Sequence, residues 1–244
     1  MVGPSRVALV TGGARRIGRV IVEDLARHGW AVAIHHNASH AEAMALATEI
    51  ASAGGKAVAV AADLTDADCI ERIIGEATGA LGPLTLLVNN ASVFEKDTVG
   101  TLDRALWHRQ MTVNLMTPVF LAEAFARQVP ADVEGNVVNL LDQRIWRPTP
   151  AYFSYQISKS ALHVATETLA QALAPRVRVN GIAPGPVLAS AHQTADRFAR
   201  QIAAIPLQRV PDLADFGRTI RYLVENRSIT GQVIALDGGQ HLRS

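Results

Sequence analysis

Three side chains suited to proton transfer lie close together in the second half of the chain. Tyr155 follows Asp142 by thirteen residues, and Lys159 follows Tyr155 by four. The apolar spacing around Tyr155 and Lys159 is helical, so both side chains are expected on one helix face. A phenol beside an ammonium should have a lowered pKa, which would make Tyr155 a proton donor near neutral pH. The spacing therefore predicts a catalyst that protonates its substrate.

A glycine-rich turn near the N-terminus predicts a nucleotide site. A β-branched run leads into Thr11-Gly12-Gly13-Ala14-Arg15-Arg16-Ile17-Gly18, after which a helical pattern begins. Glycine permits a tight turn and close approach to phosphate, and the helix N-terminus donates N–H groups to a pyrophosphate. Such a turn alone could be purely structural. Its place after the first predicted strand favours dinucleotide binding.

The end of the second predicted strand decides between the two nicotinamide cofactors. A NAD site places a carboxylate there, about twenty residues after the turn, for the ribose 2′-hydroxyl. This chain offers only neutral polar groups, while Arg15 and Arg16 lie in the turn, and guanidinium groups favour a 2′-phosphate. NADP(H) is therefore predicted. The neutral groups are His36, Asn37 and Ser39, and His35 and His36 are interpreted as surface residues at the strand end.

Short β-branched runs alternate with helical stretches along the whole chain. The predicted strands are Arg6–Val10, Ala31–His35, Ala57–Ala61, Leu84–Val88, Asn136–Leu141, Val177–Ile182 and Val233–Leu236. The predicted helices are Ile17–His28, Ser39–Ala53, Asp66–Leu81, Asp103–Gln128, Tyr155–Ala174, Ala195–Ala204 and Leu213–Glu225. This alternation predicts an α/β fold with one parallel sheet of about seven strands and helices on both faces. The segment Pro184–Thr194 is predicted to be a mobile substrate lid.

Composition excludes several classes of function. The net charge is +1 without a long basic run, which argues against a nucleic-acid partner. The single cysteine, Cys69, excludes an internal disulfide and a cysteine metal cluster, and no metal site is predicted. No apolar run reaches the roughly 18 residues of a membrane span, and the apolar start is cut short by Thr11. A cytoplasmic, soluble protein is expected.

Short polar motifs follow the predicted strands in a fixed order. They are Thr11-Gly12 with Gly18, Asp63, Asn89-Asn90-Ala91, Asn114, Tyr155 with Lys159, Pro184-Gly185 and Asp237-Gly238-Gly239. Over nearly the whole chain this order resembles the short-chain dehydrogenase/reductase family. The resemblance implies a single Rossmann-type domain over residues 1–244 with a doubly wound parallel sheet, NAD(P) binding and a homotetramer.

The resemblance also implies roles for individual residues. Tyr155 would donate the proton, Lys159 would bind the nicotinamide ribose and lower the Tyr155 pKa, and Asn114 would hold a water in a proton relay. The cofactor would be bound by Gly12, Arg15, Arg16, Ile17, Gly18, His36, Asn37, Ser39, Asp63, Leu64, Asn90, Ala91, Tyr155, Lys159, Pro184 and Gly185.

Three departures from the common family pattern point to a subfamily. Arg16 replaces the middle glycine of the turn, Ser92 follows Ala91 where glycine is usual, and Asp142 replaces a serine. Together with Phe94 they resemble the pteridine reductases and the dihydromonapterin reductases. That resemblance implies a pterin stacked between nicotinamide and Phe94, with Arg16 reaching both cofactor phosphate and substrate. The expected substrate contacts are Arg16, Ser92, Phe94, Asp142, Tyr155, Pro186 and Val187.

The chemistry of Asp142 supports a pterin independently. An ionised carboxylate only accepts hydrogen bonds and would repel the oxyanion that forms when a ketone is reduced. A pterin offers an amino group, ring nitrogens and a C=N bond that needs a proton on nitrogen. The first hypothesis is therefore an NADPH-dependent reductase of a dihydropterin such as dihydromonapterin or dihydrobiopterin, or of dihydrofolate.

Other readings remain open. A carbonyl or enoyl compound is the alternative substrate, with Asp142 a local variation, and a non-catalytic NADP(H)-binding protein is a third hypothesis. Phe94 could be ordinary packing, and Trp146 and Tyr152 could flank the pocket or pack elsewhere. Pteridine reductases often carry an arginine where this chain has Ala38, so the 2′-phosphate would depend on Arg16, Ser39 and their neighbours.

Overall fold

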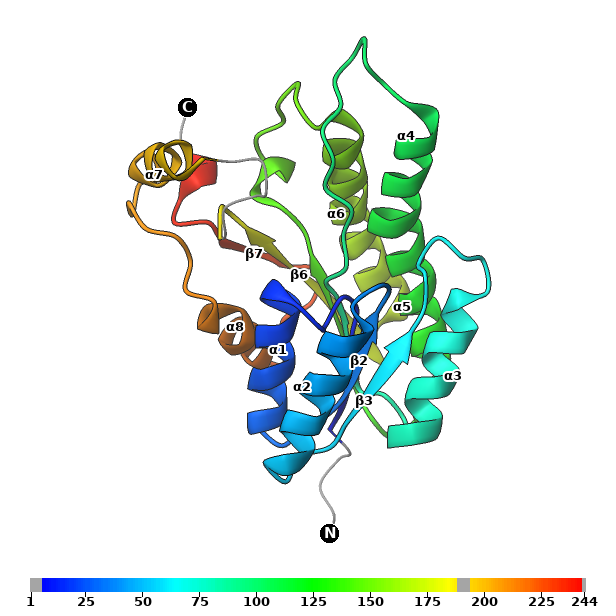
Figure 1. Cartoon of the computed structure of the whole chain (residues 1–244). Helices are drawn as coiled ribbons and strands as arrows, with labels where there is room; N and C mark the ends of the chain where they lie inside the picture. Colours follow the sequence, from blue (N-terminus) through cyan, green and yellow to red (C-terminus); the bar gives the residue numbers. More distant parts are fainter. Residues whose placement is uncertain (1–5, 188–193, 243–244) are drawn as a thin grey trace.

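A parallel seven-stranded sheet forms the centre of the protein (Figure 1). The computed structural model describes residues 6–187 and 194–242. The strands are β1 (Val7–Val10), β2 (Ala31–His36), β3 (Ala57–Ala61), β4 (Leu86–Asn89), β5 (Gly135–Leu140), β6 (Val177–Pro184) and β7 (Val233–Leu236). They lie in the order β3-β2-β1-β4-β5-β6-β7, and every neighbouring pair is parallel. The predicted α/β class, Rossmann-type sheet and seven strands are confirmed.

Helices connect the strands and cover both faces of the sheet, as predicted. They are α1 (Arg16–Arg27), α2 (His40–Ser52), α3 (Cys69–Leu81), α4 (Arg104–Met111), α5 (Thr117–Gln128), α6 (Phe153–Leu173), α7 (Ala195–Ala203) and α8 (Ala214–Glu225). Three short segments complete the described elements: the π-helical η1 (Thr112–Met116) and the 3-10 helices η2 (Gln143–Ile145) and η3 (Gln240–Leu242).

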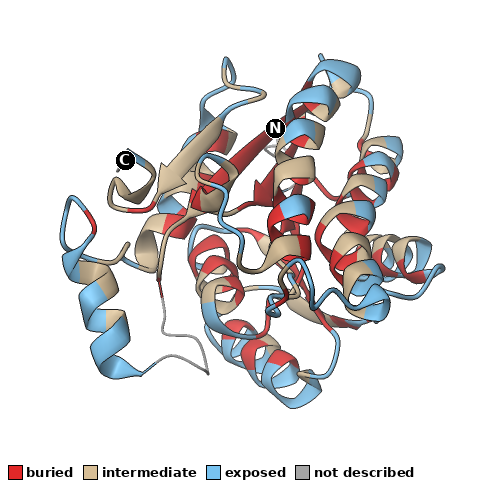
Figure 2. Cartoon of the chain, turned by 90° about the horizontal axis from the view of Figure 1, so that it is seen from above, coloured by how far each residue is buried: buried red, intermediate tan, exposed pale blue. Residues whose placement is uncertain are grey.

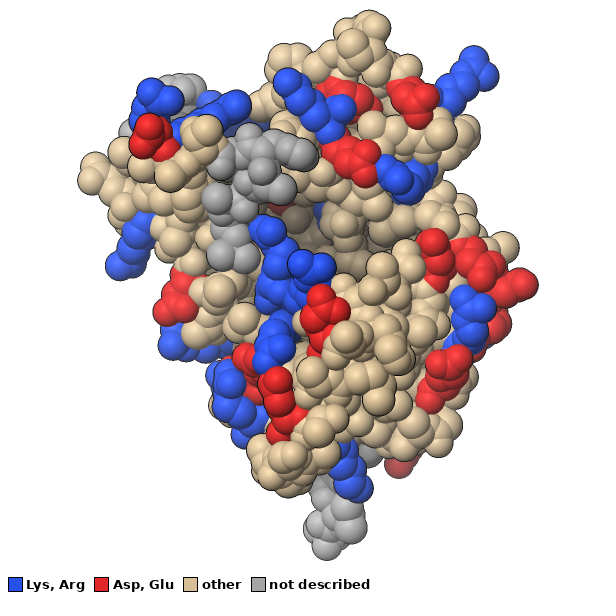
Figure 3. All heavy atoms as spheres, in the orientation of Figure 1, with Lys and Arg blue, Asp and Glu red and all other residues tan. Residues whose placement is uncertain are grey.

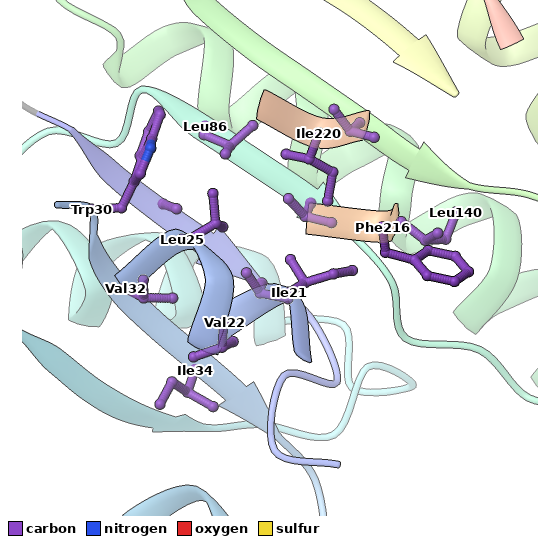
Figure 4. Packing of buried hydrophobic residues seen from close by; sticks show 14 of the residues in the cluster. Ile21, Val22, Leu25, Trp30, Val32, Ile34, Leu86, Leu140, Phe216 and Ile220 are labelled. Carbon is purple, nitrogen blue, oxygen red and sulfur yellow. The ribbon is translucent and has the colours of Figure 1, made fainter. Parts of the chain in front are cut away.

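Two hydrophobic clusters lie on the two sides of the sheet. On one side, α1, α2 and α8 pack on the strands, and Figure 4 shows Ile21, Leu25, Phe216 and Ile220 among the side chains of this cluster. On the other side, α3, α5 and α6 bury a cluster that includes Phe125. The central strands are therefore buried on both faces, and buried residues concentrate on the strands and the inward helix faces (Figure 2).

The strand order places a crevice at the carboxyl ends of β1 and β4. From β1 the chain proceeds to β2 and β3 in one direction, whereas β4 to β7 extend in the other. Connections that leave a parallel sheet in opposite directions open a crevice at this switch point, where α/β proteins bind ligands. The glycine-rich turn begins beside the end of β4 there, where Thr11 N donates to Val88 O at 3.0 Å.

Several predicted boundaries differ from the structure. The predicted helix Asp103–Gln128 is one helical run interrupted by the π-helical turn η1, which contains Asn114. Helix α3 starts at Cys69 instead of Asp66, because the Asp66 side chain closes a turn by accepting from Asp68 N at 3.3 Å. Of the predicted lid, residues 188–193 lie outside the described residues.

The described part of the chain holds no helix that is both long and apolar enough to cross a bilayer. Within the same residues, no group of three or more His, Cys, Asp and Glu side chains is placed to hold a metal ion.

Candidate active site

A cavity of about 710 Å³ opens at the switch point of the sheet. Figure 3 shows basic side chains gathered along one edge of a hollow in the surface. Predicted site residues that line the cavity are Gly12, Arg15, Arg16, Ile17, Gly18, Asn37, Asp63, Leu64, Asn90, Ala91 and Ser92. It is also lined by residues without a predicted role, namely His35, Thr65, Val93, Glu95, Arg109 and Val113. The size lies within the range of small-molecule and cofactor sites.

The glycine-rich turn is held by the segment after β4. Asn90 Nδ2 donates to Thr11 O at 2.9 Å and to Gly12 O at 3.1 Å. In return, Thr11 Oγ1 accepts from the backbone N–H groups of Asn90 and Ala91 at 2.9 and 3.0 Å. A side chain at Gly18 would place its Cβ 2.1 Å from Gly12 O, so only glycine fits there. The turn thus presents backbone atoms, and hydrogen bonds between the residues after β1 and those after β4 hold it in place. Such a surface suits the close approach of a phosphate.

Arg16 occupies the turn in an unusual backbone conformation. Its φ of 52° lies in the left-handed region, where glycine is normally found. This explains physically why glycine is common at the position, and why an arginine there costs stability of order 1 kcal/mol or more. Gly12, with φ 62°, is also left-handed. A strained arginine lining the cavity is the kind of outlier that concentrates at binding sites.

His35 is buried beneath the turn, so the interpretation of His35 and His36 as surface residues is wrong. His35 Nδ1 accepts from Gly12 N at 3.1 Å, and its Nε2 lies 3.1 Å from Ala62 O, to which it donates. This pairing requires the neutral ring, and burial lowers its pKa to about 4. His35 therefore ties the glycine turn to the end of β3. The residue type gave no signal of this, because the contact joins segments 23 residues apart.

The remaining residues at the ends of β2 and β3 divide into two groups. Asn37 lines the cavity and hydrogen-bonds Asp63, whose pKa is lowered mainly by hydrogen bonds from the backbone and hydroxyl of Thr65. His36 is buried with its ring against His40 at 5.3 Å, and neither His36 nor Ser39 lines the cavity.

Asp142, Tyr155 and Lys159 meet at the end of β5. Asp142 lies two residues after the end of β5, while Tyr155 and Lys159 lie in the first two turns of α6. Tyr155 donates its hydroxyl proton to Asp142 Oδ2 at 2.9 Å. Lys159 Nζ donates to Leu140 O at 2.7 Å and lies 6.0 Å from the centre of the Tyr155 ring. The structure thus joins the three predicted groups, with the acid and the phenol in direct contact.

The electrostatics of this group differ from the prediction. Burial, followed by the Asp142 charge and hydrogen bond, raises the pKa of Tyr155 well above its ordinary value. Burial also lowers the pKa of Lys159 to about 8, against the opposing attraction of Asp142. The expected depression of the Tyr155 pKa by Lys159 is wrong, because the ammonium bonds a backbone carbonyl and an acid touches the phenol. Tyr155 is consequently protonated at any physiological pH.

Asn114 joins the segment after β4 to helix α6. Its Nδ2 donates to Val93 O at 2.9 Å and Ser158 Oγ at 3.1 Å, while its Oδ1 accepts from Val93 N at 2.8 Å and Ser92 Oγ at 3.1 Å. A side-chain amide offers two donors and two acceptor lone pairs, so this side chain is fully used. A relay water at Asn114 would therefore have to bind the main chain of the π-helical turn, a feature frequent at functional sites.

Aromatic rings form a wall next to the Asp142–Tyr155 pair. Phe94 stacks on Tyr152 with ring centres 4.3 Å apart and planes within 6°, and it meets Tyr155 edge-on at 4.7 Å. Phe94 remains 40% exposed, so its surface is available to a further flat ring. Trp146, by contrast, packs against His241 at 4.9 Å and His163 at 6.3 Å.

Sequence reasoning missed Asp97, a buried carboxylate at the start of α6. Both of its oxygens accept from Ser154 N, at 3.1 and 3.3 Å, and Oδ2 also accepts from Ser154 Oγ at 2.5 Å. Gln110 Nε2 completes the network by donating to Ser154 Oγ at 2.9 Å. A carboxylate at a helix N-terminus satisfies free N–H groups and the helix dipole. Asp97 thereby connects the Phe94 segment to the helix that carries Tyr155.

The predicted contacts Pro184, Gly185, Pro186 and Val187 follow or end β6 and do not line the cavity. Pro184 is the last residue of β6, and Gly185 N donates to Leu236 O at 2.9 Å. A Cβ at Gly185 would stand 2.8 Å from the Asp237 backbone, which explains the glycine. Pro186 is half-buried, and Val187 is buried in the cluster around α1 and α8.

Comparisons with known proteins agree with this geometry. A family model described as short chain dehydrogenase matches residues 6–200. The chain is similar to a FolM alternative dihydrofolate reductase 1 from Brucella canis, whose crystal structure is complexed with NADP, at 57% identity and a TM-score of 0.95, over 98% of this chain and 94% of that one. It is 32% identical to an uncharacterized oxidoreductase of Methylorubrum extorquens over 96% of this chain and 97% of the relative. A 3-oxoacyl-[acyl-carrier-protein] reductase FabG of Staphylococcus aureus is 29% identical, over 98% and 99% of the two chains.

Proposed function

The chain belongs to the short-chain dehydrogenase/reductase family, and from this premise we propose that it reduces a C=N bond of a dihydropterin with NADPH. It is an oxidoreductase of this family, and relatives of known structure are complexed with NADP. The observation that carries the substrate class is the Asp142–Tyr155 hydrogen bond beside the partly exposed ring of Phe94.

The cavity fits NADP(H) on its own features. The glycine turn presents backbone without side chains at Gly12 and Gly18, and α1 begins at Arg16. Arg15 and Arg16 supply positive charge to the cavity, and Asn37 is a neutral group beside it. Bound NADPH would supply a hydride. Lys159 would hold the nicotinamide ribose, exchanging its bond to Leu140 O for a ribose hydroxyl.

Tyr155 and Asp142 have a clear role once hydride reaches the carbon of a C=N bond. The nitrogen left behind is strongly basic, so even a phenol of raised pKa is acidic enough to protonate it. Before transfer, Asp142 accepts a hydrogen bond from the Tyr155 hydroxyl. Once Tyr155 has given that proton to the nitrogen, Asp142 would keep its two bonds from Arg144, and the phenol would take a new proton from solvent before the next turnover. Phe94 would stack on one face of the pterin ring, and Arg16 would reach both cofactor phosphate and substrate.

A second candidate is reduction of a carbonyl. Arg144 Nη1 pairs with Asp142 Oδ2 at 3.0 Å, and the Lys159 ammonium lies nearby, so the carboxylate charge is offset. Repulsion of a developing oxyanion is therefore smaller than Asp142 alone would cause. The similarity to 3-oxoacyl-[acyl-carrier-protein] reductases favours the same reading.

Two variants distinguish these functions. Asp142→Ser should lose dihydropterin reduction at least about tenfold, because the shared hydrogen bond is gone, and should retain or gain activity on ketones. Phe94→Ala should raise the dihydropterin KM several-fold, since stacking contributes about 0.5–1.5 kcal/mol beyond burial, with little change in NADPH affinity. Initial rates of NADPH oxidation measure both effects. If both variants reduced dihydropterins as well as the wild type, the pterin assignment would be wrong.

A further inference from the structure

Arg144 contacts Asp142 and the rings of Phe94 and Tyr152, although no motif pointed to it. It lies in η2, directly after Asp142, and its side chain is 24% exposed. Its backbone N–H donates to Asp142 Oδ1 at 2.9 Å and its Nη1 donates to Oδ2 at 3.0 Å. Both carboxylate oxygens are therefore bound by the same residue, a geometry that fixes the plane of the carboxylate.

The same guanidinium reaches the aromatic wall. Its central carbon lies 5.3 Å from the centre of the Phe94 ring and 5.4 Å from that of Tyr152. At these distances a guanidinium is attracted to the rings. The backbone of Arg144 is fixed as well, because Gln156 Nε2 donates to its carbonyl oxygen at 2.8 Å. One side chain thus connects Asp142 to the rings Phe94 and Tyr152, and its own backbone is anchored to α6.

Asp142 Oδ2 is the point where these contacts converge. It accepts simultaneously from Arg144 Nη1 and from the Tyr155 hydroxyl. A carboxylate carries about four lone-pair sites, and Arg144 with Tyr155 fills three of them. Only one lone-pair site of Asp142 therefore remains for a substrate amino group. We infer that the carboxylate acts chiefly on Tyr155.

We propose that Arg144 is a positioning residue for the proton donor: it aims Asp142 Oδ2 at the Tyr155 hydroxyl and couples that alignment to the Phe94–Tyr152 wall. The proposal rests on the proposed function only for the identity of the substrate. The proposal requires that Arg144 act through Asp142, so the effect of removing Arg144 should depend on whether Asp142 is present. A merely structural role of Arg144 would show no such dependence.

The test is a double-mutant cycle of Arg144→Gln and Asp142→Asn, assayed with NADPH and any substrate that the wild type reduces. Arg144→Gln alone should lower kcat roughly 10- to 100-fold, as expected for loss of a charge-assisted hydrogen bond, with unchanged NADPH affinity. In the Asp142→Asn background the same change should cost less than about threefold, because the group it aims is already gone. Arg144→Lys, which keeps the charge, should recover part of the lost kcat.

Arg147→Gln is the matched control. Arg147 lies in the same segment and bonds Gln240 O at 3.3 Å, away from the pair, so its loss should leave kcat unchanged. An equal kcat cost of Arg144→Gln in both backgrounds would overturn the proposal.

A crystal structure of Arg144→Gln provides a readout that needs no substrate. The Asp142–Tyr155 hydrogen bond should be lengthened beyond bonding distance or lost, whereas an unmoved pair would refute the positioning role. Absence of dihydropterin reduction by the wild type would instead reject the proposed function and leave this structural test standing.

Discussion

At the scale of single residues, the main feature of the site is that Tyr155, the proposed proton donor, is hydrogen-bonded to an acid. Its hydroxyl donates to Asp142, and burial keeps the phenol protonated. The phenol is therefore protonated before each turnover, and its acidity depends on the neighbouring charges of Asp142 and Arg144. Such a donor suits a strongly basic product nitrogen better than a weakly basic one.

We expect the preference for NADPH over NADH to depend on the neutral residues that follow β2. Asn37 lines the cavity beside Asp63, so Asn37→Asp would place a second carboxylate near the expected 2′-phosphate. We expect the ratio of NADPH to NADH specificity to fall about tenfold or more through repulsion. Asn37→Ser, which removes the amide without adding charge, is the control. Equal kcat/KM of the wild type for both cofactors would contradict the assignment of NADP(H).

Lys159 should make stability depend on pH in a defined direction. Its folded pKa of about 8 lies below its ordinary value of 10.5, so between these values the unfolded state binds more protons. Below pH 8 the folded protein bears the full free-energy cost of burying the charged ammonium. This cost disappears as the pH rises above 8 and Lys159 loses its proton. In urea unfolding, the free energy of unfolding of the wild type, relative to that of Lys159→Met, should rise by on the order of 2 kcal/mol between pH 8 and 10. A difference independent of pH would contradict the cause given for the lowered pKa.

At the scale of elements, the site depends on how helix α6 begins. Tyr152, its N-cap, has a left-handed φ of 58°, and the next turn carries Tyr155. Asp97 holds this strained start by capping Ser154 from the Phe94 segment. The π-helical turn around Asn114 fixes the same helix one turn later through Ser158. Tyr155, the proposed proton donor, is therefore positioned by contacts from two other segments.

Loss of the Asp97 cap should affect both stability and activity. Asp97→Ala leaves the Ser154 N–H and the Ser154 hydroxyl proton without a buried acceptor, while Gln110 still donates to Ser154 Oγ. The loss should lower the free energy of unfolding by about 1–3 kcal/mol and reduce kcat. Asp103 caps α4 through Leu106 N at 2.7 Å in an exposed position, so Asp103→Ala is the matched control. That variant should cost about 1 kcal/mol of stability and no activity. Equal activity of both variants would show that the α6 cap does not position Tyr155.

These elements also show what sequence could and could not predict. The glycine turn, the strand periodicity and the Tyr155–Lys159 spacing are local patterns, and they predicted the sheet and the three groups that meet at the end of β5. The hydrogen-bonding roles of Asp97 and His35 were not predicted, because their partners lie 57 and 23 residues away in the sequence. A single acid or histidine also forms no periodic pattern that could reveal its role. The pKa of Tyr155 was mispredicted because it depends on burial and on Asp142, which only the fold brings into contact.

At the scale of the whole molecule, exposed apolar side chains lie on two neighbouring helices. Phe120 of α5 and Val164 of α6 are 48% and 60% exposed, and the two helices pack against each other. Met116, in the π-helical turn preceding α5, is also exposed. A homotetramer, expected from the family, would bury such a surface.

Light scattering coupled to size-exclusion chromatography measures the assembly directly. The wild type should elute with four times the chain mass, and Phe120→Asp with Val164→Asp should yield smaller species by placing charges in the interface. Met44→Asp on α2 replaces another exposed apolar residue and should leave the mass unchanged. A monomeric wild type would contradict the predicted tetramer.

The central claim is that this reductase acts on a pterin, and the most direct measurement compares substrates on the wild-type protein. NADPH oxidation should be followed at neutral pH with dihydrobiopterin, dihydromonapterin and dihydrofolate, and in parallel with a 3-oxoacyl thioester and simple ketones. The Asp142–Tyr155 pair beside Phe94 predicts that kcat/KM for at least one dihydropterin exceeds that for every ketone by tenfold or more. Efficient turnover of a 3-oxoacyl thioester with no reduction of any dihydropterin would contradict the claim and identify a carbonyl reductase.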